Sequence, residues 1–553
     1  MPIHDPAARL LIIGLDGGTW DVFGPLCDLG EMPNLARLRN QGAWSTLWST
    51  QPPFTAPAWA SFLTGVNPGR HGILQFLCEP ADPAASLRGE GIPINASHLR
   101  VPTVWDYFNA AGKTVGVINV PLSYPLRPMD GFGISGMLTP PSATDWTYPP
   151  ELAASLDGYI IDLDYGRPGQ PLASGHLPAP AVMLSDIAHM TERRGYHTLR
   201  LMQENDWDAL MVVFTGTDRI FHHFWKYLQT KEAEPQSLEF AVSEQLAGYF
   251  HLLDNILGSL ARAAGKDANV VFVSDHGFGP AAQHWAHLNN WLLEIEALHL
   301  HAVSPGDWLQ RVRRRAPWLR DVAKRILPAE ARAAVQERGH LADAIDWADT
   351  QAWAEPLYNN VGGVYLHRAD RYADGAVSPA TSDRLCQHLI DEAQHLRIPG
   401  TNRPLVTDIQ RREDVYSGPH AGSFPDLIIT LDPDYVVVPT LGTSLITPVH
   451  RLLRSGDHRP DGMFLVCGPN VQPGFLPDTP GLIDMAPTLL HLADLPTPAE
   501  MEGQVVSSAF TDGYLVLHPP RRGPVLPPPA PAEALRADEA AAVTDHLRSL
   551  GYL

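Results

Sequence analysis

Cysteine is scarce in this sequence, which has only four in 553 residues: Cys27, Cys78, Cys386 and Cys467. They are widely separated and include no C-x-x-C pair, which argues against a disulfide scaffold and predicts reduced, partly buried thiols. Basic residues are also few, because 40 lysines and arginines stand against 61 acidic residues and leave a net charge of −21. A chain this acidic repels polyanions, so a long nucleic acid is not expected as a substrate.

Long hydrophobic runs are missing as well, since no stretch approaches the roughly 20 apolar residues that a membrane-spanning helix requires. The first residues, MPIHDPAARLLIIGLDG, lack the basic region, long apolar segment and cleavage site of a secretory signal. We therefore expect a cytoplasmic protein without a transmembrane segment. Its 553 residues are enough for a large core with an inserted subdomain.

Three short apolar runs have the composition of strands that are buried on both faces of a parallel sheet, and an acidic residue follows each run. The runs cover residues 10–15, 210–214 and 269–273, and the acidic residues are Asp16, Asp218 and Asp275. Open α/β sheets bind ligands at the carboxyl ends of their strands. The sequence therefore predicts a doubly wound α/β fold with a carboxylate-rich site at this edge.

Histidines accompany these carboxylates. His276 directly follows Asp275 on a turn. His222 comes four residues after Asp218, which places both on one face of a predicted helix. His458 lies in GDHRPDG, a turn-rich loop before a predicted strand. Carboxylate and imidazole ligands in this mixture suit zinc, with manganese as the alternative.

Thr55 immediately precedes a helix predicted over residues 58–63. A threonine in that position is usually an N-cap, whose hydroxyl accepts a hydrogen bond from the helix backbone. The functional alternative is a nucleophile, deprotonated by a coordinating metal, beside helix N–H groups that face an incoming phosphoryl oxygen. The other candidates also have structural alternatives as caps or core residues, and only their conjunction favours a metal site.

Seven longer segments resemble the type I phosphodiesterase/nucleotide pyrophosphatase branch of the alkaline phosphatase superfamily. They span most of the chain in the order found in the family. The segments are IIGLDGGTW (12–20), MPNLARLRNQGA (32–43), PPFTAPAWASFLTGVNPGRHGI (52–73), TGTDRIFHHFW (215–225), VFVSDHGFGP (271–280), DHRPDGMFLVCGP (457–469) and IDMAPTLLHLADLPTPAEMEG (483–503).

The resemblance implies an alkaline-phosphatase-like fold, in which helices flank a mostly parallel sheet, and a site for two divalent metal ions. In this family Thr55 would be the nucleophile and would form a covalent phospho-threonine that water then hydrolyses. The two ions of such sites lie roughly 4 Å apart and stabilise the attacking and leaving oxygens. The implied ligands are Asp16, Thr55, Asp275 and His276 for one ion, and Asp218, His222 and His458 for the other.

One departure from the family concerns the substrate. Nucleotide pyrophosphatases carry a phosphate-binding asparagine a few residues after the His-Gly-Ile motif, where this sequence has Phe76. Gln75 or a residue from elsewhere replaces that amide, or metals and backbone alone hold the phosphate. Asn289 is a further candidate substrate contact. Because apolar residues surround Thr55, a monoester would bury an unpaired phosphate oxygen, so diesters are the expected substrates.

Four regions are expected along the chain. The second of them, a helical cap, contains a basic segment over residues 308–327. This segment could offer arginines to an anionic substrate, form a solvated helix face or, as a third alternative, lie on a membrane surface. The regions are residues 1–280 as the first part of the catalytic core, with an irregular insertion over about 138–188, residues 281–352 as the cap, 353–515 as the second part of the core, and 516–553 as a proline-rich linker with a short helix that begins at residue 534.

We interpret the protein as a metal-dependent hydrolase of phosphodiester or pyrophosphate bonds in small anionic substrates. A phosphomonoesterase or phosphonate hydrolase of the same superfamily is the alternative. Sulfatases use a cysteine or serine and the metal-dependent phosphoglycerate mutases a serine as nucleophile, so Thr55 counts against both. A different class, a catalytically inactive metal-binding interaction protein, would use the cap and tail for partners, but the complete ligand set argues against it.

Overall fold

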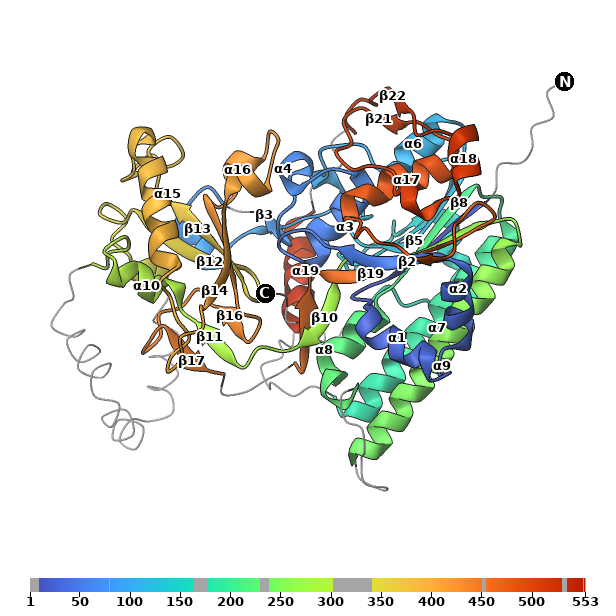
Figure 1. Ribbon diagram of the computed structural model, residues 1–553, viewed down its shortest axis with the longest axis horizontal. Coiled ribbons are helices and arrows are strands. Elements are labelled where there is room, and N and C mark those ends of the chain that lie inside the picture. The colour runs from blue at the N-terminus through green and yellow to red at the C-terminus, as the bar shows by residue number, and fades with distance from the viewer. Residues whose placement is uncertain are drawn as a thin grey trace.

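A computed structural model describes residues 9–78, 80–163, 178–228, 238–301, 341–449, 454–529, 535–550 and 552. Figure 1 shows a larger part, with a long sheet between helices, beside a smaller part with its own sheet. The basic segment predicted over residues 308–327 lies outside the described residues. Within the described ranges, no helix combines the length and the hydropathy that a membrane crossing requires.

A nine-stranded sheet forms the centre of the larger part, and its central strands are parallel, as predicted. The first strand, β1 (Leu10–Leu15), pairs with β8 (Ala209–Phe214) on one side and with β9 (Asn269–Val273) on the other. These three strands end together at one edge of the sheet. The full order is β20 (Gly474–Phe475), β2 (Ala43–Trp48), β19 (Asp461–Cys467), β9, β1, β8, β5 (Val115–Val120), β6 (Gly131–Ser135) and β7 (Thr147–Tyr148).

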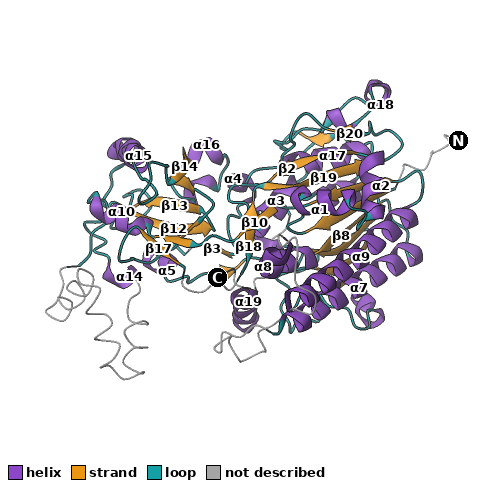
Figure 2. Cartoon of the chain, turned by 60° about the horizontal axis from the view of Figure 1, so that its bottom comes forward, coloured by secondary structure: helices purple, strands orange, loops and turns teal. Residues whose placement is uncertain are grey.

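Helices cover both faces of this sheet (Figure 2). Successive side chains of β1 alternate between two apolar clusters, with Leu11 and Ile13 in one and Leu10 and Ile12 in the other. Burying each such side chain stabilises the fold by about 1.5–3 kcal/mol. The first face is covered by α1 (Trp20–Asp28), α2 (Pro33–Gln41), α7 (Pro180–Glu204), α8 (Gly216–Leu228) and α9 (Leu238–Ala264), and the second by α3 (Thr55–Thr64), α6 (Val104–Ala110) and α17 (Met485–Leu492).

The smaller part contains a four-stranded antiparallel sheet with a separate apolar cluster around Trp353 and Leu389. The chain leaves this part to re-enter the nine-stranded sheet at β19. The boundaries of the four regions expected from the sequence stay predictions. The sheet has the order β12 (Ala352–Tyr358), β13 (Val361–Leu366), β15 (Leu427–Leu431) and β14 (Val406–Arg411), and α10 (Leu288–Glu294) and α15 (Pro379–Ala393) pack in the same cluster.

The described residues also form several shorter elements. The final helix, α19 (Ala537–Leu550), begins three residues later than expected. The other short elements are α4 (Pro68–His71), α5 (Pro83–Leu87), α14 (Leu341–Ala344), α16 (Arg412–Val415), α18 (Asp512–Leu517), β3 (Leu77–Cys78), β4 (Ile92–Pro93), β10 (Gly277–Pro280), β11 (His284–Ala286), β16 (Tyr435–Val437), β17 (Ile446–Pro448), β18 (Gly456–Arg459), β21 (Thr497–Pro498) and β22 (Arg522–Gly523).

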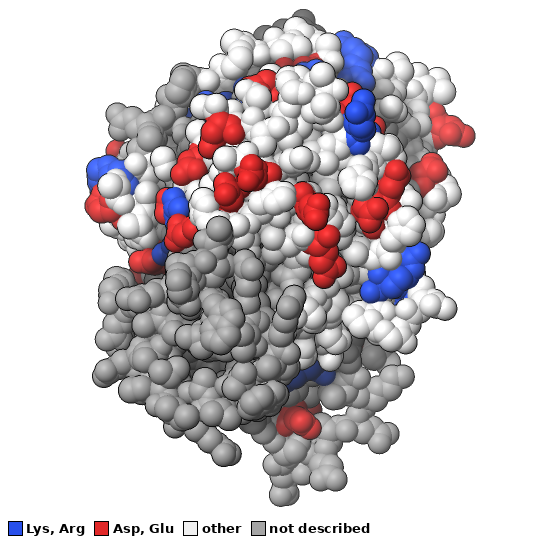
Figure 3. All heavy atoms as spheres, turned by 90° about the vertical axis from the view of Figure 1, so that its left-hand side faces the viewer, with Lys and Arg blue, Asp and Glu red and all other residues white. Residues whose placement is uncertain are grey.

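The expectation from cysteine content agrees with the structure. Cys27, Cys386 and Cys467 are buried free thiols, and Cys78 is half-buried. On the face shown in Figure 3, acidic side chains are more widespread than basic ones, in keeping with the net charge of −21.

Candidate metal centre

The three predicted carboxylates meet at the edge where the central strands end. Asp16 follows β1, Asp275 follows β9, and Asp218 lies in the first turn of α8, directly after β8. All three are buried. The turn after β1 requires a glycine, because Gly17 has a φ of 69° and a Cβ there would lie 2.5 Å from the Phe278 ring. The Gly17 N–H donates to Oδ1 of Asp275 over 3.1 Å, which links two of the strand ends.

The three predicted histidines join these carboxylates from different elements. His222 lies one turn after Asp218 on α8, as the spacing predicts. His458 was expected in a loop, and this was wrong, because it lies in β18. That strand pairs with β10, in a register that places His458 opposite Phe278. The imidazole rings of His276 and His458 consequently stack, with their centroids 3.5 Å apart.

Backbone carbonyls fix the tautomer of each imidazole. A carbonyl oxygen can only accept a hydrogen bond, so an Nδ1 atom facing one carries the hydrogen and the neutral ring keeps a lone pair on Nε2. Metal-binding histidines are typically held in this manner. The Nδ1 contacts are His222 with Gly456 O (3.1 Å), His276 with Gly277 O (3.2 Å) and His458 with Pro53 O (3.1 Å).

The Nε2 lone pairs of two of these histidines face the Asp218 carboxylate. The Nε2 atoms of His222 and His458 each lie 3.3 Å from Oδ1 of Asp218 and 3.1 Å from one another. Three electron-rich atoms this close repel one another unless a cation lies among them. Ligands at about 2.0–2.2 Å from a common tetrahedral zinc ion would have separations of about 3.3–3.6 Å, so the arrangement fits such an ion with little adjustment.

A second group of ligand atoms surrounds the third imidazole. Nε2 of His276 lies 3.2 Å from Oδ2 of Asp275 and 3.8 Å from Oδ1 of Asp16. The hydroxyl oxygen of Thr55 lies 3.4 Å from the same Nε2. Asp16, Asp275 and His276 together bring their ligand atoms close enough to share an ion. This group therefore offers the mixed oxygen and nitrogen donors that the sequence predicted.

Three carboxylate oxygens of the site are buried without a hydrogen-bond partner among the residues that the structure describes: Oδ1 of Asp16, Oδ1 of Asp218 and Oδ2 of Asp275. An unpaired buried carboxylate oxygen is costly, and most buried polar atoms in proteins are paired. Each of these oxygens faces an imidazole Nε2 instead. The residues present therefore fit divalent cations.

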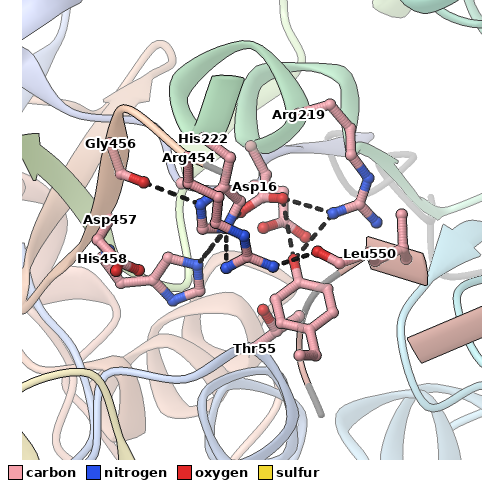
Figure 4. Close-up of polar contacts among 12 residues, drawn as sticks. Asp16, Thr55, Arg219, His222, Arg454, Gly456, Asp457, His458 and Leu550 are labelled. Atoms are coloured by element: carbon pink, nitrogen blue, oxygen red, sulfur yellow. Dashed lines mark hydrogen bonds and ion pairs between the residues drawn. The ribbon is translucent and has the colours of Figure 1, made fainter. Parts of the chain in front are cut away.

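The remaining oxygen of Asp218 is held by two donors that were not predicted. Nη1 of Arg219 donates to Oδ2 over 2.6 Å, and the Tyr552 hydroxyl donates to the same oxygen over 2.9 Å. Arg219 also forms a 2.7 Å ion pair with Asp162. Figure 4 shows Arg219 and His222, both from α8, and His458, from β18, converging on this space.

Burial and mutual repulsion shift the pKa values of the carboxylates. Burial raises the pKa of Asp275 to about 8. Burial, followed by the charges of Asp275 and Asp218, raises the pKa of Asp16 well above its ordinary value. Burial alone would also raise the pKa of Asp218, but positive charge beside it, including that of the Arg219 guanidinium, lowers the pKa well below its ordinary value. Asp16 and Asp275 therefore resist ionisation until a cation joins them.

Burial has the opposite effect on two of the imidazoles. It lowers the pKa of His458 to about 4 and, together with the neighbouring His458, lowers the pKa of His276 well below its ordinary value. Both rings are consequently neutral near pH 7, which is the form that binds a metal ion.

Thr55 is the first residue of α3 rather than its N-cap, so the capping alternative is wrong. The N-cap is Phe54, and α3 begins earlier than the helix expected over residues 58–63. Thr55 is 1% exposed, and its hydroxyl lies beside His276. The side chain is therefore directed at the ligand cluster.

The candidate substrate contacts occupy different places. Phe76 packs its ring against Phe54 and Tyr552, with centroid distances of 4.7 and 5.1 Å. Nε2 of Gln75 donates to the Pro356 carbonyl over 3.4 Å. Asn289 lies in α10, in the smaller part, and does not join the centre.

The side-chain amide of Asn289 is fully buried and bonds both the N–H and the carbonyl of Ala354, each over 2.8 Å. It therefore ties α10 to the adjacent strand β12. A local sequence pattern could not distinguish this structural amide from a ligand-binding one.

Comparison with known proteins finds similarity to one family's sequence profile and to several solved structures. The sequence profile described as type I phosphodiesterase / nucleotide pyrophosphatase matches residues 10–458. No curated protein matches the sequence.

Among solved structures, the phosphonoacetate hydrolase of Sinorhizobium meliloti 1021 in complex with phosphonoacetate is similar with a TM-score of 0.52 and 16% identity, over 88% of this chain and 96% of that chain. Its complex with phosphonoformate gives the same values. Murine ectonucleotide pyrophosphatase / phosphodiesterase 5 has a TM-score of 0.45 and 13% identity, over 88% of this chain and 95% of that chain. The likeness to the phosphonoacetate hydrolase shows a shared fold.

Proposed function

Since the chain belongs to the type I phosphodiesterase / nucleotide pyrophosphatase family and is a metal-dependent hydrolase of phosphoric esters, we propose that Thr55 is its nucleophile and that two divalent ions, zinc by preference, serve the reaction. The substrates would be small anionic molecules with a phosphodiester or pyrophosphate bond. The observation that carries the proposal is the convergence of three imidazole Nε2 atoms on three buried carboxylate oxygens that lack another partner among the described residues.

Two groups of side chains would hold the ions. Bound there, the ions would polarise the phosphoryl group and neutralise the negative charge that develops on its oxygens. Manganese remains the alternative to zinc. The groups are Asp16, Thr55, Asp275 and His276 for one ion and Asp218, His222 and His458 for the other.

The position of Thr55 at the start of α3 suits nucleophilic attack. Its oxygen would attack phosphorus while the ester or pyrophosphate oxygen leaves, which forms a phospho-threonine that water then hydrolyses. The first N–H groups of a helix have no intrahelical acceptor, so those of Thr55 and Ala56 are available to the phosphoryl oxygens. Both residues are buried, which excludes competing solvent from the attacking oxygen.

The wall beside Thr55 favours an organic substituent on the phosphate. Phe54, Phe76 and Tyr552 form a continuous aromatic surface there. The nearby Arg219 guanidinium already pairs with Asp218 and Asp162, so it is not free to receive the extra charge of a monoester. A diester matches this surface better, because it presents less charge and more apolar area.

The cytoplasmic location expected from the sequence also stays a prediction.

The proposal is tested by hydrolysis of bis-p-nitrophenyl phosphate. We expect zinc-loaded protein to release p-nitrophenol, a strong chelator to abolish the reaction, and added zinc to restore it. The matched control is Asp218→Asn, which retains the shape of the side chain but weakens its charge toward the ion. Failure of the wild-type protein to hydrolyse this diester, a pyrophosphate and a nucleotide diester with zinc or manganese would refute the proposal.

A further inference from the structure

The segment that follows the proline-rich linker packs onto the candidate metal centre. Val543, Leu547 and Leu550 of α19 share an apolar cluster with Phe54 and Phe76, which flank the Thr55 side of the site. This packing fixes the end of α19 next to the metal ligands. The segment therefore contributes to the centre although it lies outside the matched region, residues 10–458.

Arg454 strengthens this attachment. Its Nη2 donates to the carbonyl oxygen of Leu550, the last residue of α19 (Figure 4). The same guanidinium lies over the Tyr552 ring at 5.2 Å from the centroid, and its Nη1 lies 3.5 Å from Nε2 of His222. The end of α19 and the metal ligand His222 are thus joined through one arginine.

Tyr552 reaches the ligands themselves. Its hydroxyl donates to Oδ2 of Asp218 over 2.9 Å and accepts a hydrogen bond from Nη1 of Arg219, also over 2.9 Å. Its ring lies 5.1 Å from that of Phe76 and 5.8 Å from that of Phe54, so the orientation of the hydroxyl is set by aromatic packing.

The two oxygens of Asp218 are consequently used differently. Oδ2 receives hydrogen bonds from Arg219 and Tyr552, whereas Oδ1 has no hydrogen-bond partner among the described residues and faces both imidazoles. Hydrogen bonds to one oxygen fix the plane of a carboxylate and the direction of the other oxygen. A tyrosine that blocked the centre would instead have to occupy Oδ1 or the imidazole nitrogens.

We propose that Tyr552 is a positioning residue of the metal centre, which acts with Arg219 to hold Oδ2 of Asp218 so that only Oδ1 is presented to the ion shared with His222 and His458. This inference rests on the proposed function, because it requires an ion at that site. It assigns to the segment after the linker a direct role in metal binding.

The test is a direct measurement of zinc affinity in the full-length protein. Tyr552→Phe removes the hydroxyl and retains the ring, so folding should be preserved, which circular dichroism and the Tm of the metal-free protein will check. The matched control is Tyr107→Phe, which removes a tyrosine hydroxyl that donates to Glu500 over 2.6 Å in a different apolar cluster. Competition with a chromophoric chelator gives the Kd of each ion.

We expect Tyr552→Phe to weaken one of the two zinc sites by about tenfold or more, the usual effect of losing such a partner, and to leave the other site unchanged. The absorption spectrum of the Co²⁺-loaded variant should also change, because Arg219 alone would then hold Oδ2 of Asp218 and the carboxylate would be oriented less firmly toward the ion. Tyr107→Phe should match the wild type in both measurements.

Unchanged zinc affinity and an unchanged cobalt spectrum in Tyr552→Phe would overturn the inference while the proposed function stands. Faster turnover with unchanged zinc affinity would also overturn it, because Tyr552 would then obstruct the site. Absence of zinc binding in the wild type would refute the metal centre itself, and the inference with it.

Discussion

The hydroxyl oxygen of Thr55 lies 3.4 Å from Nε2 of His276, although 221 positions separate the two residues in the chain. Thr55 begins α3, and His276 lies just after strand β9. The contact places the hydroxyl within the group of buried carboxylates instead of at a helix cap. This position is the one that the proposed roles of Thr55 as ligand and nucleophile require.

Thr55→Ala should lose turnover by more than about a thousandfold while it keeps its fold and most of its metal. The reason is that, in the proposed mechanism, the hydroxyl would be one metal ligand among several but the sole attacking group. Initial rates with bis-p-nitrophenyl phosphate, elemental analysis and Tm measure the three properties.

Thr55→Ser is the matched control for this substitution, because it retains a hydroxyl at the start of α3 and should keep measurable turnover. If Thr55→Ala instead kept a substantial fraction of the wild-type rate, the nucleophile would be water.

The carboxylates could be predicted from the sequence because their positions follow from a simple rule of parallel sheets. Buried parallel strands are recognisable as short continuous apolar runs. The residues that follow the strand ends Leu15, Phe214 and Val273 must then lie near one edge of the sheet. The helical spacing from Asp218 to His222 is likewise local. These parts of the fold and site required no knowledge of tertiary contacts.

Other parts depend on distant contacts that leave no local signal. The segment around His458 is rich in turn-forming residues, but pairing with β10 makes it a strand, because strand formation depends strongly on its neighbours. The hydrogen bond from Tyr552 to Asp218 spans 334 positions and depends on where α19 packs. Arg219 could have been noticed, since it adjoins Asp218, but its partner Asp162 could not.

Purified protein should contain close to two divalent ions per chain, and His222→Ala should retain about one. The substitution removes one of the three donor atoms of the group formed by Asp218, His222 and His458, and leaves the group around His276 complete. Elemental analysis after gel filtration gives the stoichiometry. His251→Ala is a suitable control, because His251 is exposed and pairs with Glu31 on the surface. Two ions in His222→Ala would mean that the second site lies elsewhere.

Metal binding should release protons at pH 7 and should strengthen as the pH rises toward 8. The carboxyl of Asp275 has a pKa of about 8 in the metal-free protein against an ordinary value of 3.8, so an ion must displace its proton below pH 8. The pKa of His458 is about 4, so that ring contributes no proton at pH 7. Calorimetric titration in buffers of different ionisation enthalpy counts the protons released.

The same pKa shift predicts how the stability of the metal-free protein depends on pH. A carboxyl whose pKa is raised in the folded protein adds to the free energy of unfolding. This contribution is complete below the ordinary pKa of 3.8 and is lost as the pH rises to about 8. Asp275→Asn cannot ionise, so between pH 5 and pH 8 its Tm should fall less than that of the wild type. Equal slopes for the two proteins would contradict the raised pKa.

Diesters should be hydrolysed with a kcat/KM at least about tenfold higher than matched monoesters, because each buried phosphate oxygen without a donor costs about 1–3 kcal/mol. The wall beside Thr55 is aromatic, and Phe76 is 1% exposed between Phe54 and Tyr552. Bis-p-nitrophenyl phosphate and p-nitrophenyl phosphate share a leaving group, which makes their rates comparable. Phe76→Asn should narrow the gap by adding a donor, whereas Phe76→Leu, the apolar control, should preserve it. Both variants lose aromatic packing, so the ratio of the two rates is taken within each protein. Equal or faster monoester turnover in the wild type would show that a donor absent from this wall receives the additional charge.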